Sequence, residues 1–216
     1  MTNKLRTLTT AAVLSVLLQG CSLFSDDEEL YSPLPEIQAE FSPEVEWRKS
    51  IGSGVGEYYS QTRTLLANEQ LFAASRAGLV TALDPLSGDE IWQQDLSEQD
   101  IFNRFDDRDD ALLSGGIAAG YGMVFVGSEN ALLFALDDKT GEVIWQVETD
   151  GEVIASPVVD EGLVIIQTGS GSLIGFDVQT GEQRWIQSSE LPALTLRGNN
   201  SPITTNGAAT YGRSDG

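Results

Sequence analysis

The chain has 216 residues and is strongly acidic, with 33 Asp and Glu side chains against 12 Lys and Arg and a formal net charge of −21. This balance argues against nucleic acid as a partner, whose phosphates would be repelled, and against electrostatic adsorption to anionic lipid. The sequence has no His and a single cysteine, Cys21. Disulfides, zinc ligation, a His general base and a Ser-His or Cys-His nucleophile are therefore excluded. Paired carboxylates stay open, although no spacing singles out a pair.

Residues 1–20 are predicted to be an export signal, because two basic residues precede the apolar run Leu8–Leu18. The run is too short to span a bilayer, which takes about 20 apolar residues. Its end, Leu18–Cys21, resembles a lipoprotein signal, which implies lipidation of Cys21 and, with Ser22 next, transfer to the outer membrane. Removing the signal leaves 10 basic side chains against 33 acidic ones, a charge of −23, so attachment would depend on the acyl chains.

Residues 21–43 are predicted to be the lipidated Cys followed by a flexible acidic tether, because the segment carries charge and Pro without periodicity. After it, residues 44–50 contain Trp47 in the context Glu-Val-Glu-Trp, which resembles the end of a later repeat although no strand pair precedes it. We interpret 44–50 as the closing strand of a last propeller blade, because a closed ring leaves no unpaired strand edge.

One template occurs three times, at 82–92, 135–145 and 175–185. It reads Ala or Gly, any residue, Asp, two free positions, Ser or Thr, Gly, three free positions and Trp. The aligned residues are Asp84, Asp137 and Asp177; Gly88, Gly141 and Gly181; and Trp92, Trp145 and Trp185. The Asp carboxylate can accept backbone N–H bonds and the Gly permits a positive φ, so the template predicts a strand, a tight turn and a second strand bearing the Trp. We favour a packing role for Trp over stacking on a sugar or base.

Two further apolar runs precede each template, the first of them at 64–67, 116–119 and 154–159. Four strands at a period near 40 residues predict an all-β fold, a β-propeller of four-stranded antiparallel blades. We place the blades, within a partial propeller spanning 44–216, at 60–96, 112–148 and 153–188, with half of a fourth at 200–216. Three and a half blades are too few for a closed ring, so we expect a truncated part of a longer protein.

Two loops contain residue types that also occur in ligand-binding loops. Residues 51–57 have the glycines of a phosphate loop but no following Lys-Ser or Lys-Thr, so we expect a flexible connector. The acidic loop 98–110 holds the 13 residues by which the first repeat exceeds the others, and its segment 106–110 lacks the alternating ligands and central Gly of a calcium loop. We therefore assign no metal and no cofactor.

The template is similar to the repeat of pyrroloquinoline-quinone-type propellers, which include alcohol dehydrogenases and non-catalytic relatives. More closely, the chain resembles the N-terminal half of the BamB family, outer-membrane lipoproteins of the β-barrel assembly machinery. This resemblance rests on unique stretches that occur in order, namely Leu18–Phe24, Ser32–Pro35, Ser50–Gly56, Arg76–Val80, Ala111–Gly116 and Leu191–Gly198.

The resemblance implies an eight-bladed, non-enzymatic scaffold, lipid-anchored on the periplasmic face of the outer membrane. It implies binding to the periplasmic domains of the central, BamA-type assembly subunit through Leu194, Leu196 and Arg197, in the loop between the third and fourth blades. Unfolded outer-membrane proteins are a further hypothetical partner. The alternative is a periplasmic quinoprotein-type dehydrogenase or another cofactor-binding propeller. The lone cysteine disfavours the dehydrogenase, because such enzymes commonly carry an adjacent Cys pair.

Overall fold

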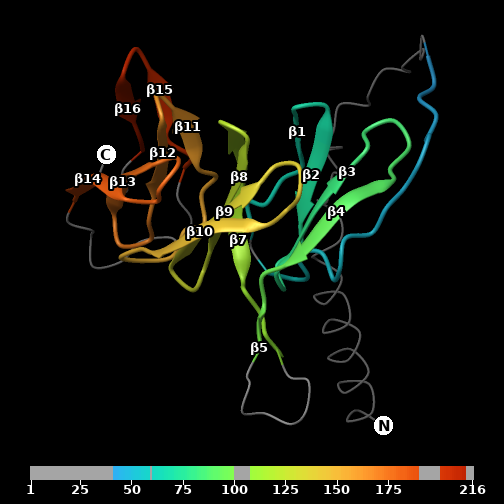
Figure 1. The fold of residues 1–216 in the computed structure, drawn as a ribbon, viewed down its shortest axis with the longest axis horizontal. Coiled ribbons are helices and arrows are strands. Elements are labelled where there is room, and N and C mark those ends of the chain that lie inside the picture. Colours follow the sequence, from blue (N-terminus) through green and yellow to red (C-terminus); the bar gives the residue numbers. More distant parts are fainter. Residues whose placement is uncertain (1–40, 59, 100–107, 190–199, 213–216) are drawn as a thin grey trace, which may run out of the picture. The chain divides into compact units, whose positions relative to one another are not determined.

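The computed structural model describes residues 41–58, 60–99, 108–189 and 200–212. The chain separates into two compact units, 1–44 and 45–216, and the sheets below belong to the second (Figure 1). The predicted signal, Cys21 and nearly all of the tether lie outside the described residues. In the part that is described, no helix has the length and apolar character needed to span a membrane.

Three four-stranded antiparallel sheets follow one another along the chain, and in each the spatial order of the strands follows the sequence. The first sheet comprises β1 (Leu65–Ala67), β2 (Gln70–Ala74), β3 (Leu79–Leu83) and β4 (Glu90–Asp95). The second comprises β7 (Leu113–Gly120), β8 (Met123–Ser128), β9 (Leu132–Asp137) and β10 (Val143–Glu148). The third comprises β11 (Val158–Asp160), β12 (Leu163–Gln167), β13 (Ser172–Asp177) and β14 (Gln183–Ser188). These sheets, called blades 1 to 3 below, confirm the predicted all-β fold of four-stranded antiparallel blades.

Two short hairpins complete the described strands. One consists of β15 (Ile203–Thr205) and β16 (Ala208–Thr210) and follows blade 3. The other, β5 (Glu98–Gln99) and β6 (Arg108–Asp109), lies within the acidic segment that the sequence predicted to be a loop. The first two strands of each repeat are joined by a two-residue turn in which both residues have positive φ, as at Asn68 and Glu69 (φ 49° and 62°). Such turns match the right-handed twist of the strands they join.

The hydrophobic core lies between blades rather than within one. Phe72, Val80 and Trp92 of blade 1 pack against blade 2, where β8 contributes Val124 and Val126. The other face of β8 contributes Met123 and Phe125 to a second cluster that includes Phe176 of blade 3. Since successive side chains of a strand point to opposite faces, a strand buried on both sides is apolar without alternation. Each blade therefore depends on its neighbours for a core.

The aspartates of the template hold the turns between the third and fourth strands of each blade. Asp84 Oδ1 accepts the N–H groups of Leu86 and Ser87, both at 2.8 Å. Asp137 and Asp177 accept the corresponding pairs of N–H groups in blades 2 and 3, at distances between 2.8 and 3.0 Å. These bonds stabilise the ionised carboxylates and so lower the pKa of Asp84 and of Asp137. For Asp177 the largest cause is the guanidinium of Arg184, 2.8 Å away, which with the backbone bonds lowers the pKa to about 2.

The tryptophans of the template dock on the turn of the following blade. Trp92 Nε1 donates to the carbonyl of Asp138 at 2.9 Å, and its ring covers Gly141, where an added Cβ would lie 2.4 Å from the ring. Trp145 does the same to blade 3, donating to Val178 O at 3.1 Å and covering Gly181. Because Gly141 also has φ 75°, two constraints exclude any other residue there.

Trp47 docks on blade 1 in the same manner, through the carbonyl of Pro85 at 3.2 Å and the face of Gly88. Trp185 contacts Gly175 of its own blade, and the described residues contain no following turn for it to cover. Residues 44–50 form no ladder with the described strands, so the prediction that they close a last blade stays a prediction. A strand needs a neighbour to pair with, and the described residues supply none; the Trp47 contact forms without one.

The run 154–159, predicted as one strand, is strand only from Val158 onward. Pro157 has no N–H to give to a ladder, and the preceding residues are used for packing instead. Val153 donates its N–H to Ser128 O at 2.9 Å and lies against Gly115 and Gly127 of blade 2, where a Cβ would come within 2.4 Å of it. This part of the chain therefore packs against blade 2 before blade 3 begins.

Replacing Trp92 with Ala should lower the free energy of unfolding of the full-length protein by about 3–5 kcal/mol, because a large buried side chain and its cavity are lost. Trp92→Phe should cost only about 1–3 kcal/mol, since the ring largely remains while the carbonyl of Asp138 loses its donor. Equilibrium urea unfolding would measure both. Equal stability of Trp92→Ala and the wild type would contradict the docking role.

Arg184→Ala should raise the pKa of Asp177 from about 2 toward its ordinary value of 3.8, while leaving the pKa of Asp137 unchanged. Since the folded pKa of Asp177 is depressed, its stabilising contribution is present above pH 3.8 and is lost as the pH falls toward about 2. An NMR titration of the side-chain carboxyl carbons in the wild type and variant would measure both sites. Parallel shifts at Asp137 and Asp177 would refute the assignment to Arg184.

Candidate functional site

The residues predicted to bind a partner, Leu194, Leu196 and Arg197, lie outside the described residues, as does Cys21. The described ends of their segment are Ser188, where β14 ends, and Ile203, where β15 begins. The segment therefore leaves blade 3 at the end of the sheets that carries the links between blades. We call this the connector end. It also holds the turns between the second and third strands of each blade.

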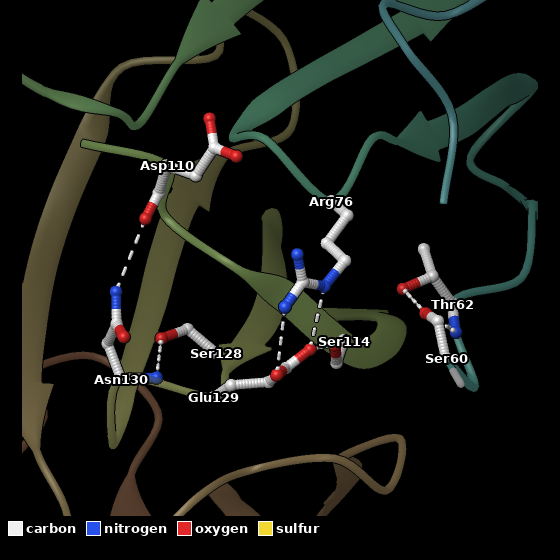
Figure 2. Close-up of polar contacts among 8 residues, drawn as sticks. All are labelled: Ser60, Thr62, Arg76, Asp110, Ser114, Ser128, Glu129 and Asn130. Carbon is white, nitrogen blue, oxygen red and sulfur yellow. Dashed lines mark hydrogen bonds and ion pairs between the residues drawn. The ribbon is translucent and has the colours of Figure 1, made fainter. Parts of the chain in front are cut away.

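A bidentate ion pair joins blades 1 and 2 at the connector end (Figure 2). Arg76, in the β2–β3 turn, donates from Nε to Glu129 Oε1 at 2.9 Å and from Nη2 to Oε2 at 3.1 Å. Glu129, in the β8–β9 turn, also accepts a hydrogen bond from the hydroxyl of Ser114. Both charged side chains are largely buried, with 14% and 7% of their surfaces exposed. The bond to Glu129 raises the pKa of Arg76, although burial opposes the shift.

Arg76 also contacts the segment 51–58, which precedes blade 1. Its backbone N–H donates to Gly54 O at 2.8 Å, and its guanidinium carbon lies 4.0 Å from the centre of the Tyr58 ring, a cation–π contact. Gly52, Gly54 and Gly56 all have positive φ, which lets the connector curl tightly. The segment 51–57 is thus held against blade 1 by Arg76, and its glycines allow the tight turns. The sequence had predicted a flexible connector.

Blades 2 and 3 are joined differently at the connector end. Asp150, in the link between them, accepts hydrogen bonds from the hydroxyls of Thr168, at 2.8 Å, and of Ser172. Ser172 also contacts the hydroxyl of Ser188 at 3.0 Å. Burial pushes the pKa of Asp150 upward, but the hydroxyl donors outweigh it and leave the pKa below its ordinary value. This arrangement is a hydrogen-bonded carboxylate, and its donors explain its charge without a metal.

A polar cavity of about 450 Å³ lies where the innermost strands begin. Ser60, Thr62 and Arg63 line it from the approach to β1, and Ser156 and Asn200 from the approaches to β11 and β15. The innermost strands contact one another, β1 with β7, β7 with β11 and β11 with β15. The cavity therefore marks the axial side of the blades at the connector end. Its hydroxyls and amides suit hydrogen bonding, and no described lining residue is a carboxylate.

No group of three or more Asp, Glu, Cys or His side chains in the described part of the chain is placed to hold a metal ion. The described carboxylates with lowered pKa bind turns or neighbouring blades, as set out above. What the connector end offers is a surface of turns and links for recognition, set on rigid sheets. Sequence reasoning missed Arg76 and Glu129 as a pair. The two residues occupy aligned positions in the first two repeats, just after the second strand. Two opposite charges at aligned positions of neighbouring repeats were the signal that could have revealed the pair.

Arg76→Met should destabilise the full-length protein by about 3–5 kcal/mol, because it takes the guanidinium away from a carboxylate that is 7% exposed. The double variant Arg76→Met, Glu129→Leu should recover most of that loss, since it removes both buried charges together. Urea unfolding of the two variants and the wild type would decide. A double variant less stable than Arg76→Met would show that the desolvated charge is not the cause.

Comparison with known proteins gives the family. A family model described as outer membrane protein assembly factor BamB matches residues 44–216. Relatives of that name are 42% identical to this chain in Yersinia pestis, over 213 residues, and 42% identical in Escherichia coli K12, over 216 residues. These alignments cover 98% and 99% of this chain but 54% of each relative. The chain thus spans about half the length of the curated relatives it matches.

Solved structures show the same fold. The crystal structure of BamB from Moraxella catarrhalis matches with a TM-score of 0.55 at 23% identity, covering 68% of this chain and 40% of that one. A europium-containing methanol dehydrogenase matches with a TM-score of 0.53 at 21% identity, covering 69% of this chain and 27% of the enzyme. At such identities the likeness concerns the propeller fold alone, whereas the family match runs through all three blades. The chain belongs to the family of the outer membrane protein assembly factor BamB.

Proposed function

We propose that the protein is a non-catalytic scaffold for the assembly of outer-membrane proteins. The observation that carries this proposal is the 42% identity to an outer membrane protein assembly factor over almost the entire chain. The architecture suits a scaffold, because successive blades pack on one another and form a rigid support that can hold partner domains in place. The eight-bladed ring expected from the family resemblance would need further blades beside those described.

We further propose that Leu194, Leu196 and Arg197 bind the periplasmic domains of the central assembly subunit. In an extended segment, residues at i and i+2 point the same way, so the two leucines would present one apolar surface next to a guanidinium. Apolar anchors and arginines are frequent among the residues that dominate interfaces. The segment leaves blade 3 at the connector end, where the links between blades vary while the sheets beneath them repeat.

Attachment to the membrane completes the proposal. Lipidation of Cys21 would anchor the protein at the periplasmic face of the outer membrane, since a chain with a charge of −23 after signal removal gains nothing from anionic lipid. Acyl chains contribute about 0.8 kcal/mol per buried CH₂, and more than one chain is needed for stable anchoring. Residues 22–43 would then act as the spacer between membrane and propeller.

The dehydrogenase alternative shares the fold, as the methanol dehydrogenase match illustrates. A fold carries many functions, so this likeness alone supports neither catalysis nor its absence. The much higher identity to assembly factors favours the scaffold. Absorbance spectroscopy of the purified full-length protein separates the two, because a quinone cofactor would absorb in the near ultraviolet, and its presence would overturn the non-catalytic proposal.

Replacing Leu194, Leu196 and Arg197 together with Ala should reduce recovery of the central assembly subunit at least tenfold when the full-length lipoprotein is used to capture envelope proteins. Losing two apolar anchors and an arginine from one loop removes the interactions that typically dominate binding. Quantitative immunoblotting of the captured subunit would measure the loss, and circular dichroism would establish that the variant is folded.

A matched control replaces Leu86, Ile91 and Arg48 with Ala. These exposed residues are likewise two aliphatic side chains and one arginine; Leu86 lies in the β3–β4 turn, Ile91 near the start of β4 and Arg48 next to Trp47. The control should capture the subunit as the wild type does. If both triple variants lose capture equally, or neither does, the binding site does not lie at 194–197.

A further inference from the structure

A second cavity, of about 900 Å³, opens at the connector end between blade 2 and the link that leads into it. We call it the blade 1–2 groove. Its apolar floor is formed by Leu96, Ala111, Leu132 and Phe134. Three of these four are buried, and Leu132 is half-buried. Cavities of several hundred cubic ångströms that combine apolar surface with polar groups are typical of binding sites.

The register of blade 2 places the floor and one wall of the groove on a single face. Gln146 pairs with Phe134, and Glu148 pairs with Leu132, so each pair of side chains lies on the same side of the sheet. That side is the one that packs on blade 1, because Phe134 belongs to the core shared by blades 1 and 2. The exposed Gln146 and Glu148 therefore stand beside the apolar floor, on the outermost strand.

The opposite wall comes from the link between the blades. Asp110 is exposed there, and its carbonyl accepts a hydrogen bond from Asn130 Nδ2 at 3.3 Å (Figure 2). This bond ties the link to the β8–β9 turn and helps to fix the groove's shape. Beside the two carboxylates, Asp110 and Glu148, the rim offers the amides of Asn130 and Gln146 and the hydroxyl of Thr149.

The charge of the groove is one-sided. Among the described residues that line it, two are acidic and none is Lys or Arg. A cation that interacts with Asp110 is Arg76, and its charge is already matched by the bidentate pair with Glu129. An apolar floor with an acidic rim and exposed amides suits a polypeptide whose apolar side chains enter the floor, whose basic side chains meet the carboxylates and whose backbone bonds the amides.

We propose that the blade 1–2 groove binds an extended segment of a partner protein in which apolar residues lie between Lys or Arg residues. The proposal involves none of the residues 194–197 and does not depend on the function proposed above. A neutral apolar segment is disfavoured because it leaves the two carboxylates without a counter-charge, and an acidic one because its charges repel those carboxylates.

The test uses the full-length protein and a fluorescein-labelled hexapeptide of sequence Lys-Leu-Lys-Phe-Lys-Leu, with binding measured by fluorescence anisotropy at physiological salt. Two comparison peptides replace all Lys with Glu, or all apolar residues with Ser. We expect binding of the first peptide and at least tenfold weaker binding of the other two. The double variant Asp110→Asn, Glu148→Gln should weaken binding about fivefold, since both side chains are exposed and such pairs contribute modestly.

A charge-matched control removes two carboxylates elsewhere, with Glu142→Gln and Glu182→Gln. Both residues are exposed and lie just before β10 and β14, respectively, at the end away from the groove. Binding to this control should stay within twofold of the wild type. Equal loss in the two double variants would show attraction by net charge alone, and no loss in either, or no binding by the wild type, would equally overturn the proposal.

Discussion

The contact on which the stacking of the blades depends is a tryptophan on the glycine turn of the next blade, made by Trp92 on blade 2 and by Trp145 on blade 3. The contact requires three things at once, an Asp that holds the turn, a Gly that leaves its face bare, and a backbone carbonyl that accepts the indole N–H. The Asp stabilises the turn of its own blade, whereas the bare glycine and the free carbonyl contribute only when a second blade supplies the tryptophan. Because the apolar clusters also lie between blades, sheet, core and turn are stabilised by the neighbour, as in repeat proteins generally.

The two ends of the sheets differ in how closely the repeats resemble one another. The turns that receive Trp repeat with almost the same hydrogen bonds in all three blades. At the connector end the repeats diverge, with an ion pair between blades 1 and 2, a hydroxyl-bonded carboxylate between blades 2 and 3, and links of different length. Loops on a rigid scaffold are where recognition is usually found. The blade 1–2 groove lies at this end, and blade 3 ends there at Ser188.

The repeat was enough to predict the blades, because a turn template and short apolar runs are local patterns; β3 spans Leu79–Leu83, as expected. The pattern failed where packing decides. The apolar residues at 154–155 resemble a strand, yet they are buried against blade 2 and the strand begins only at Val158. Neither the Arg76–Glu129 pair nor the groove could be found by local reasoning, since each joins segments of different blades. The residues 194–197 were proposed from family likeness, and nothing in their spacing alone distinguishes them.

The ion pair between the first two blades has a consequence for how the repeats sort themselves. Arg76 and Glu129 occupy equivalent places in their repeats, and the equivalent residue in blade 3 is Gly169, which bonds through its backbone to the link at Glu152. Three copies of one sequence would carry the same residue at all three places and could stack in any order. With one cation, one anion and one glycine, a misordered stack buries a charge without its counter-ion. Divergence at this one position therefore favours the contact of blade 1 with blade 2 over a contact of blade 1 with blade 3, in which Arg76 would face a glycine and lack a carboxylate.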